Sequence, residues 1–583
     1  MFDLSGPWQF ALGPAEDAVF HRETVLLPGA MDENRKGLDN RDNFSPRYLN
    51  RDYVYTGPAV YQREVSIPAQ WAGRPILLHL ERTKKTRVWV DGRPAGKQRN
   101  SYTTPHRYDL TALCRPGRAH TLTVEVDNSP AGMPHAMYST LWEGEAWSHQ
   151  LTEHGQTNWN GILGALRLES PPALSVSALR LRPDLSRHNL RAEVTLTRLD
   201  GAEELWGEVV LQAESWNTDQ PVHKTVPQRA GFRFAPGEHT AVLSLLHDMG
   251  ERPLLWDEFH PNLYRVTAEV WQDGALRAQA AEDFGMRSFT AGENQGGRQF
   301  FINGRPNQLR GEINCAIFPR TGYAPMGLAD WLRVFRIYKD YGLNHVRFHT
   351  WVPPRAAFQA ADRLGLYLYV ELPQWGRRMF GDIAQGDDTD VRYYQEDTKR
   401  IFAEYGNSPS FVMFALGNEE RIGFYYYEEF LQFCKGLEPD LLYSDIAGHS
   451  TYPPSADFAS KWLEPGYLPL TEPRTDWDYR EAVSTAPVPI TGHEVGQLQV
   501  YPDYERELPR YQGCVLRPRN LEHFRDILAQ AGLADRAGDF HRATGKLAAM
   551  LYRRFAESYL RTPGSGGFLL LGLQDFSGQG TAL

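Results

Sequence analysis

The feature that most constrains the fold of this chain is a change in the spacing of its apolar residues near residue 288. Before that point, short runs alternate apolar and polar residues, which is the pattern of strands with one buried face. After it, short apolar runs alternate with longer stretches of helical spacing, the pattern of a parallel sheet covered by helices. We therefore expect a multidomain protein in which β-sandwiches precede a helix-covered sheet.

Turn signals divide the β-rich part into two domains. The run Arg87–Val90, followed by Asp91-Gly92, predicts a strand that enters a hairpin turn, because Asp-Gly tolerates positive φ. The pair Pro171-Pro172 predicts a boundary. We expect a jelly-roll-like β-sandwich over residues 1–172, and residues 173–287 have a length that suits an immunoglobulin-like sandwich.

Residues 288–583 are expected to form a (β/α)8 barrel. Their length and their roughly eight strand–helix units favour a barrel over an open sheet, and no glycine-rich phosphate loop follows the first strand. The clearest strand runs are 343–349, 366–371, 411–416, 488–493 and 567–573. The clearest helical stretches are 356–364, 391–405, 425–435 and 547–560. Because so little sequence follows the last run, we expect the eighth helix to be absent.

Composition excludes several classes of protein. Hydrophobic residues make up 42% of the 583 residues and charged residues 23%, as in ordinary globular proteins. The net charge of −10 disfavours a nucleic-acid partner. No apolar stretch is long enough to span a membrane, and the first residues show no signal peptide. We expect a cytoplasmic protein unless a leader has been removed, and a homo-oligomer is compatible with the sequence.

Two glutamates stand out among the polar residues near the ends of the expected barrel strands, where barrel active sites lie. Glu419 and Glu494 fall after the fourth and seventh strands, which face each other across a barrel. Two opposed carboxylates suffice for glycoside cleavage, one protonated and one ionised. The alternative is that either glutamate is a solvated charge or an ion-pair partner of Arg347 or Arg310, which we also expect at the barrel mouth.

A series of segments resembles glycoside hydrolase family 2, the group that includes β-galactosidases, β-glucuronidases and β-mannosidases. The resemblance covers almost the whole chain, and the order of the segments makes it specific. The segments are LSGPWQFAL at 4–12, TGPAVYQREVSIP at 56–68, RVWVDGRPAG at 87–96, NWNGILGALRLE at 158–169, FGMRSF at 284–289, FFINGRPNQLRGE at 300–312, GLNHVRFH at 342–349, ADRLGLYLYVE at 361–371 and ALGNEE at 415–420.

The resemblance implies roles for four residues. Glu419 matches the acid/base and Glu494, in GHEVGQ, matches the nucleophile of a retaining enzyme. Asn418 would bond the sugar 2-hydroxyl, and Arg347 would keep the nucleophile ionised. The implied partner is an oligosaccharide or β-glycoside substrate, the implied fold is two sandwiches and a barrel, and no organic cofactor is needed.

The sequence departs from the family at the magnesium ligands of β-galactosidases, where Trp375 and Arg377 stand by position, so we expect no metal. The segment around Glu494 and the absence of a glucuronidase-like Asn-x-Lys clamp leave the sugar open. We expect β-galactosidase-like specificity, with a uronic acid or mannose as the alternative. A carbohydrate-binding protein without catalysis and a transglycosylase also stay open.

Five more side chains are candidates for substrate binding. For each of them, the alternative to substrate binding is a structural role in which the side chain packs in the core or in a loop. They are His349, Trp375, His449, Tyr452 and His493.

Overall fold

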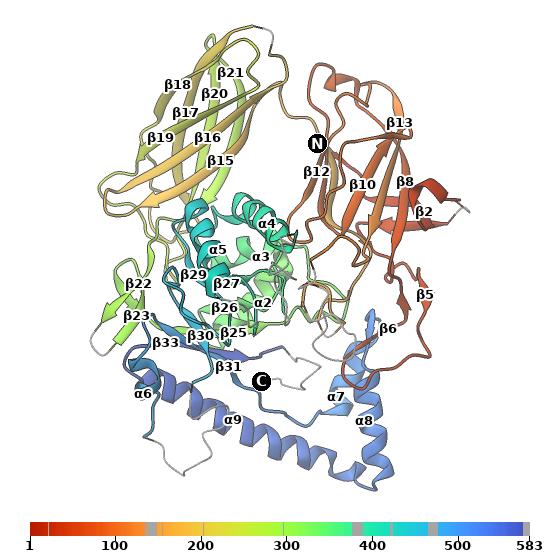
Figure 1. Ribbon diagram of the computed structural model, residues 1–583, viewed down its shortest axis with the longest axis vertical. Helices are drawn as coiled ribbons and strands as arrows, with labels where there is room; N and C mark the ends of the chain where they lie inside the picture. The colour runs from red at the N-terminus through yellow and green to blue at the C-terminus, as the bar shows by residue number, and fades with distance from the viewer. Residues whose placement is uncertain are drawn as a thin grey trace.

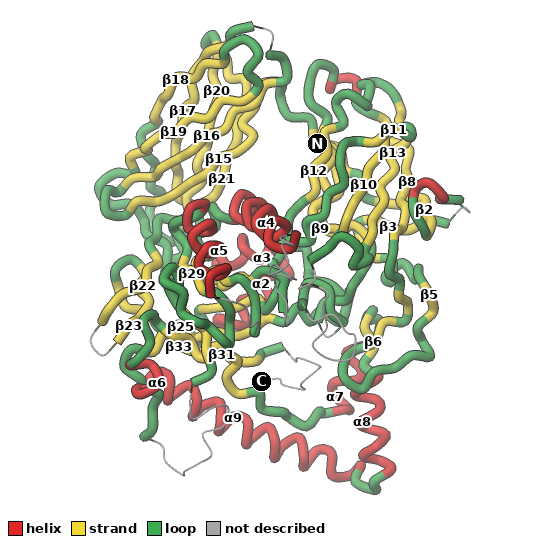
Figure 2. Tube along the Cα trace, in the orientation of Figure 1, coloured by secondary structure: helices red, strands yellow, loops and turns green. Residues whose placement is uncertain are grey.

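The structure is a computed structural model of the 583-residue chain. It describes residues 1–20, 23–134, 137, 148–153, 155–201, 203–294, 297–375, 389–419, 424–463 and 476–574. Two β-domains lie side by side above a barrel, and a helical arm crosses the far side of the barrel (Figure 1). Strands dominate the first half of the chain and helices the second (Figure 2). Among the described residues, no helix combines the length and apolarity that crossing a bilayer requires.

The N-terminal domain consists of two antiparallel sheets around one apolar core. One sheet contains β1 (Phe2–Asp3), β14 (Gly161–Glu169), β9 (Leu77–Thr83) and β12 (His106–Asp109), with β4 (Gly29–Ala30) beside β14. The other contains β11 (Arg93–Pro94), β10 (Lys85–Val90), β13 (Ala119–Asp127), β8 (Pro58–Ser66), β2 (Gly6–Leu12) and β3 (Thr24–Leu27). Asp91 and Gly92 both have positive φ between β10 and β11, which confirms the predicted hairpin turn.

The second domain has seven antiparallel strands in two sheets. One sheet contains β15 (Leu174–Asp184), β16 (Asn189–Arg198) and β19 (Thr240–Asp248). The other contains β18 (Gln228–Phe234), β17 (Leu205–Trp216), β20 (Leu263–Gln272) and β21 (Ala275–Phe284). This strand number and the shared core are those of an immunoglobulin-like sandwich. A small sheet of β22 (Phe289–Asn294), β23 (Gly297–Ile302) and β24 (Arg305–Asn307) leads into the barrel.

The barrel contains eight parallel strands whose spatial order follows the chain. They are β25 (Leu309–Asn314), β26 (His345–Phe348), β27 (Tyr367–Glu371), β28 (Phe411–Ala415), β29 (Leu442–Ser444), β30 (Ala459–Lys461), β31 (Ile490–Gly496) and β33 (Ser565–Leu571). Between β29 and β30 the ring is closed by the amide of Gly448, which donates to the carbonyl of Ser460 at 2.8 Å. The expected barrel is therefore confirmed.

The helical layer is less regular than expected. Four helices follow the first four strands: α2 (Leu328–Asp340), α3 (Arg355–Leu364), α4 (Thr389–Tyr405) and α5 (Phe424–Leu437). Residues 445–458 then connect β29 to β30 without a helix, and in the described part of the chain between β30 and β31 the helix present is the short α6 (Arg480–Ser484). Between β31 and β33 the chain forms α7 (Tyr504–Glu507), α8 (Arg519–Gln530) and the long α9 (Ala537–Arg561). The expected absence of an eighth helix concerns residues outside those described.

The N-terminal domain also contributes to the mouth of the barrel, by which we mean the carboxyl ends of its strands. The backbone amide of His149 donates to Thr350 Oγ1 at 2.8 Å, and Ser148 Oγ donates to the Thr350 carbonyl at 3.0 Å. A second contact is the hydrogen bond from Thr103 Oγ1 to Asp397 at 2.7 Å. The first domain is thus fixed against the loop that follows β26.

Candidate active site

Glu419 lies directly after β28 in a strained backbone conformation. Its φ is 53°, a region that non-glycine residues enter at a cost of about 1–2 kcal/mol. The turn is held because the amide of Glu419 donates to the Ala447 carbonyl at 2.9 Å. Among the described residues, the half-buried carboxylate then receives one hydrogen bond, from Trp375 Nε1 to Oε2 at 3.0 Å. Strain of this kind clusters at functional sites, and here it places an acid beside an indole ring.

Glu494 lies within β31, also at positive φ, and has a very different environment. Its Oε1 is 3.2 Å from His493 Nε2 and 3.4 Å from His349 Nε2. Its Oε2 accepts a hydrogen bond from Gln497 Nε2 at 3.0 Å. Arg347 Nη1 lies 3.9 Å from Oε1. This carboxylate is buried, and donors surround it on several sides.

The two carboxylates meet in one place. A carboxylate oxygen of Glu419, one of Glu494 and a ring nitrogen of His493 all lie within 4.8 Å of one another. They come from the fourth and seventh strands of the ring, β28 and β31, as the spacing in the sequence predicts. The expectation that the two glutamates share one cavity mouth therefore agrees with the geometry.

Arg347 organises the donors around this pair. It is fully buried at the end of β26, where Nε donates to Glu371 at 2.6 Å and Nη2 donates to Asn418 Oδ1 at 2.7 Å. Its Nη1 donates to His493 Nδ1 at 3.0 Å. A guanidinium can only donate, so Nδ1 of neutral His493 is an acceptor and the ring proton is on Nε2. Nε2 lies 3.2 Å from Glu494 Oε1, without the alignment of a hydrogen bond.

The surroundings drive the pKa values of the two acids apart. Burial raises the pKa of Glu419 to about 7, and the negative charge of Glu494 acts in the same direction. Burial would also raise the pKa of Glu494, but His493 and His349 hold it well below its ordinary value. Because burial lowers the pKa of His493 to about 4, this histidine is neutral near pH 7 and acts on Glu494 through its Nε2–H. Near neutrality, one acid holds a proton and the other is ionised.

Two buried amides at the mouth have unmet hydrogen-bonding capacity. The Nδ2 of Asn418 and both side-chain polar atoms of Gln374 find no partner among the described residues. The Asn418 amide group is held in place through its oxygen by Arg347. A buried polar group without a partner is rare, and a hydroxyl-bearing ligand would supply the missing bonds.

The same cluster includes potential metal ligands, since Glu419, His493 and Glu494 each offer one atom. However, the Arg347 bond to Nδ1 leaves the proton of His493 on Nε2, and a ring nitrogen must be unprotonated to bind a metal. These residues therefore fit acid–base chemistry better than a metal site. Arg377, which bears on the same question, lies outside the described residues.

Other predicted site residues are placed as follows. Trp375 and His349 contact each other, with ring centroids 4.6 Å apart, and each touches one of the two carboxylates. His449 lies near the mouth through its ring contact with Trp462 at 5.0 Å. Tyr452 packs under the Lys461 ammonium at 4.5 Å, and no contact with the carboxylates is found in the part of the chain described.

The prediction that Arg310 lies at the barrel mouth is wrong. It lies near the start of β25, and its guanidinium forms an ion pair with Glu258 at 2.7 Å and donates to the Gly342 carbonyl. It therefore sits at the amino end of the barrel rather than at the mouth. The physical reason is the register: Asn314, five residues away from the start of β25, is the position that reaches the carboxyl end of this strand.

Sequence reasoning missed three residues at the mouth. Trp462 follows the three-residue strand β30 and packs on His493, with ring centroids 4.6 Å apart. Gln497 bonds Glu494 from within the quoted segment GHEVGQ, so its position next to the expected nucleophile was the available signal. His149 comes from the first domain and contacts the rings of His349 and Trp375, and no local pattern could have shown this.

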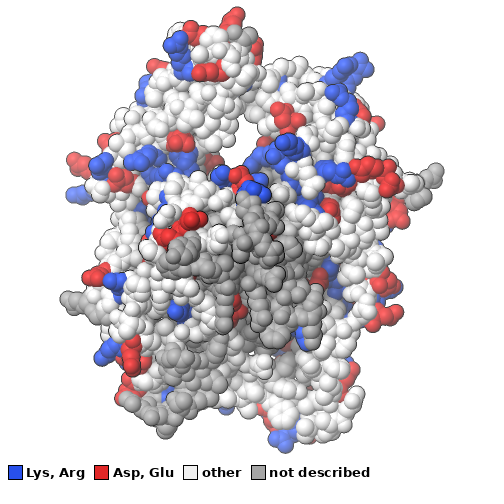
Figure 3. Space-filling model, in the orientation of Figure 1, with Lys and Arg blue, Asp and Glu red and all other residues white. Residues whose placement is uncertain are grey.

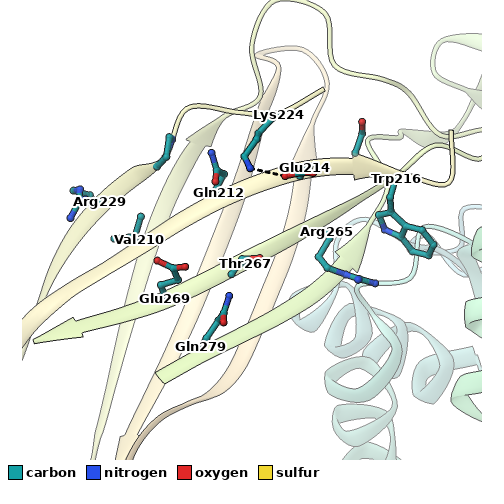
Figure 4. A pocket seen from close by; sticks show the side chains of 12 residues that line it. Val210, Gln212, Glu214, Trp216, Lys224, Arg229, Arg265, Thr267, Glu269 and Gln279 are labelled. Carbon is teal, nitrogen blue, oxygen red and sulfur yellow. Dashed lines mark ion pairs between the residues drawn. The ribbon is translucent and has the colours of Figure 1, made fainter. Parts of the chain in front are cut away.

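A separate cavity of about 520 Å³ lies on the outer face of β17 and β20 in the second domain. Figure 4 shows its polar and charged side chains, including Gln212, Thr267 and Arg265, spread along the open sheet face. An ion pair between Glu214 and Lys224 crosses it. Its lining includes Glu214 and Glu269, whereas the closely opposed acids Glu419 and Glu494 lie at the barrel mouth.

Comparisons with known proteins show what the chain is similar to. A model of "Glycosyl hydrolases family 2" matches residues 174–287. A "Putative beta-glucuronidase" of Formosa agariphila is 24% identical over 64% of this chain and 41% of its own length. A "Beta-galactosidase" of Thermoanaerobacter pseudethanolicus is 20% identical over 66% of this chain and 48% of its own length. Each match thus spans less than half of the curated relative.

Solved structures show the same fold. A Bacteroides uniformis beta-glucuronidase has a TM-score of 0.70 at 16% identity, covering 99% of this chain and 65% of its own. A beta-D-glucuronidase of Dictyoglomus thermophilum has a TM-score of 0.65 at 14% identity, covering 99% of this chain and 90% of its own. Together with the ordered motifs, these findings support the resemblance of the chain to glycoside hydrolase family 2.

Proposed function

We propose that the protein is a retaining exo-β-glycosidase that releases a terminal β-linked monosaccharide, with β-galactosidase-like specificity. The observation that carries this proposal is the pair of carboxylates on opposed barrel strands, with oxygens within 4.8 Å and pKa values shifted in opposite directions. A carbohydrate-binding protein without catalysis is not favoured, because it needs no such pair.

The separation of the carboxylates bears on stereochemistry. Retaining glycosidases hold their carboxyl groups about 5–5.5 Å apart, whereas inverting ones leave about 6.5–9.5 Å for a water molecule. One oxygen of Glu419 lies within 4.8 Å of one oxygen of Glu494, which favours the shorter of these two separations. This supports a double displacement.

In the first step, Glu494 attacks the anomeric carbon while Glu419 donates its proton to the leaving oxygen. The bond between that carbon and the leaving group breaks as the ester to Glu494 forms. The Asn418 amide, fixed by Arg347, is placed to donate to a hydroxyl next to the reacting carbon. Such a bond strengthens as positive charge develops on the ring.

In the second step, Glu419 acts as a base. It removes a proton from a water molecule that attacks the anomeric carbon, and Glu494 leaves as a carboxylate. The donors from His349, His493 and Gln497 stabilise this carboxylate both before and after the reaction. The sugar leaves with the β configuration with which it arrived.

The first-domain segment 148–153 supports action at a chain end. His149 packs against His349 and Trp375, and we expect it to close one side of the mouth. A closed side favours a terminal sugar over the middle of a chain. The expected product from an oligosaccharide is therefore the monosaccharide alone.

A panel of chromogenic β-galactoside, β-glucuronide, β-mannoside, β-glucoside and galacturonide substrates tests the proposal. We expect cleavage of the β-galactoside, and the β-glucuronide is included because one relative bears that name. Proton NMR of the first product should show the β-anomer. The α-anomer as first product, or no cleavage of any member, would contradict the proposal.

A further inference from the structure

A second cavity, of about 400 Å³, lies between the N-terminal domain and the barrel. Its floor is formed by neighbouring strands β12, β9 and β14 of the first domain, and its roof by the start of α3 and the end of α4. In the space-filling view, basic side chains gather around the opening between the two β-domains (Figure 3). The lining residues are His79, Glu81, Arg82, Pro105, Arg107, Arg167, Glu169, Met326, Pro354, Arg355, Glu404 and Tyr405.

Positive charge is concentrated on the floor of this cavity. The register of the sheet places Arg107 and Arg167 directly beside His79, one on each neighbouring strand. Arg82 lies on the same central strand as His79, and Arg355 faces them from the first turn of α3. A helix start of this kind adds partial positive charge.

The acidic lining residues neutralise only part of this charge. Glu404 forms ion pairs with Arg107 at 3.0 Å and Arg355 at 2.8 Å, and Glu169 pairs with Arg167 at 2.6 Å. Glu81 is not paired with an arginine in the described part of the chain, and its carboxylate accepts the Ala165 amide at 2.6 Å.

Arg82 is the uncompensated charge. Its Nη1 donates to the carbonyls of Tyr102 at 2.9 Å and Val352 at 3.0 Å, and no carboxylate lies within ion-pair distance among the described residues. Its side chain is only 5% exposed. A buried cation without an anionic partner is costly, which is why such groups are normally paired.

Two atoms in the cavity wall also lack hydrogen-bond partners. Arg82 Nη2 and His79 Nδ1 are buried, and neither has a partner within the described residues. His79 is 6% exposed, and burial together with Arg167 and Arg107 lowers its pKa to about 4. Both atoms lie beneath the surface of the cavity wall, and an oxyanion in the cavity would offset the charge of Arg82, which has no carboxylate partner among the described residues.

We propose that this cavity binds a small oxyanion, the carboxylate of an acidic saccharide or a free sulfate or phosphate ion, through Arg82 and His79. The site is separate from the paired glutamates and does not depend on the proposed glycosidase activity. Arg82 also bonds Val352, in the loop that carries His349, so a bound anion would strengthen the contact between the first domain and the barrel.

Thermal unfolding and calorimetry of the full chain test this inference. Sodium sulfate, sodium phosphate, glucuronate and galacturonate are titrated at constant ionic strength against sodium chloride, with glucose and galactose as neutral sugars. We expect a saturable rise in Tm, and a matching heat of binding, with at least one oxyanion but not with chloride or the neutral sugars. A response to sulfate or phosphate alone assigns the site to free ions, and a response to the uronates alone assigns it to acidic saccharides.

Variants locate the binding. We expect Arg82→Gln and His79→Leu each to weaken the oxyanion response at least tenfold, whereas Arg229→Gln, on the second domain, leaves it unchanged. A uronate bound at the barrel mouth would survive both substitutions, so the two places are distinguishable. If neither class of anion gives a saturable response in the unmodified chain, or if both variants respond like it, the proposal is wrong. His79→Leu keeps the test valid if loss of the Arg82 backbone contacts prevents folding.

Discussion

Glu419 and Glu494 lie on two sides of the barrel mouth, which we call the β28 wall and the β31 wall after the strands that carry them. The surroundings of the two carboxylates differ. On the β28 wall, Glu419 receives one hydrogen bond from the residues that the structure describes, from the Trp375 indole. On the β31 wall, Glu494 is within reach of two histidines and Gln497, with Arg347 behind them. The comparison shows that identical carboxyl groups can differ in protonation because of burial, neighbouring charge and the donors around them.

The largest effect on activity is expected from removing the ionised carboxylate of Glu494. We expect Glu494→Gln to lower kcat on an activated aryl glycoside by roughly 10⁴-fold or more, because the nucleophile is lost. Circular dichroism should show an unchanged fold. The matched control is Glu312→Gln, since burial raises the pKa of Glu312 to about 8 and the residue is already neutral near pH 7. Activity near that of the unmodified chain in Glu494→Gln would refute its role.

Removing the other acid should have a smaller effect that depends on the leaving group. We expect Glu419→Gln to lower kcat/KM by about 10²–10⁴-fold for a substrate whose leaving group needs a proton. A dinitrophenyl glycoside, which leaves without one, should lose much less in the first step. An equal loss for both substrates would show that Glu419 does not donate the proton.

Replacing His493, on the β31 wall, should have a smaller effect on activity than removing either carboxylate. His493→Phe removes the Nε2–H that lies near Glu494, so the pKa of Glu494 should rise. We expect kcat to fall about tenfold, and the acid limb of the pH profile to move to higher pH, because the nucleophile is then protonated over a wider range. An acid limb that stays in place would mean that His493 only fills space.

The smallest effect on activity is expected from replacing Trp375, on the β28 wall. The Trp375 bond lowers the pKa of Glu419, so Trp375→Phe should raise that pKa and move the alkaline limb to higher pH. The change in maximal rate should be only a few-fold. Trp351→Phe is the control, because Trp351 Nε1 donates to the Asn314 carbonyl in the core. An alkaline limb that moves in both variants, or in neither, would contradict the assignment.

Sequence reasoning reached the fold wherever a repeating pattern was long enough to detect. The strand before Glu419 has five residues, all apolar, and the strand that contains Glu494 has seven residues, all buried, and both were found. Strands β29 and β30 have three residues each, too few to show a period, so the irregular helices around them and the nearby Trp462 were not predicted.

Residues of the candidate site could be predicted only where they lie at the carboxyl ends of recognisable strands. Arg347 and Arg310 look alike in sequence, but one lies at the carboxyl end of its strand and the other at the amino end. His149 could not be assigned to the mouth, since the docking of one domain on another leaves no local sequence pattern.

The central claim is that the two acids differ in protonation because each responds to the other and to its own wall. Carbon-13 NMR of glutamate labelled at the side-chain carboxyl measures this directly, with Glu419→Gln used to assign the signal. We predict that Glu419 titrates near pH 7 in the unmodified chain, and that its pKa falls toward the ordinary 4.5 when Glu494→Gln removes the neighbouring charge. A Glu419 signal that titrates near 4.5 in both proteins would contradict the account.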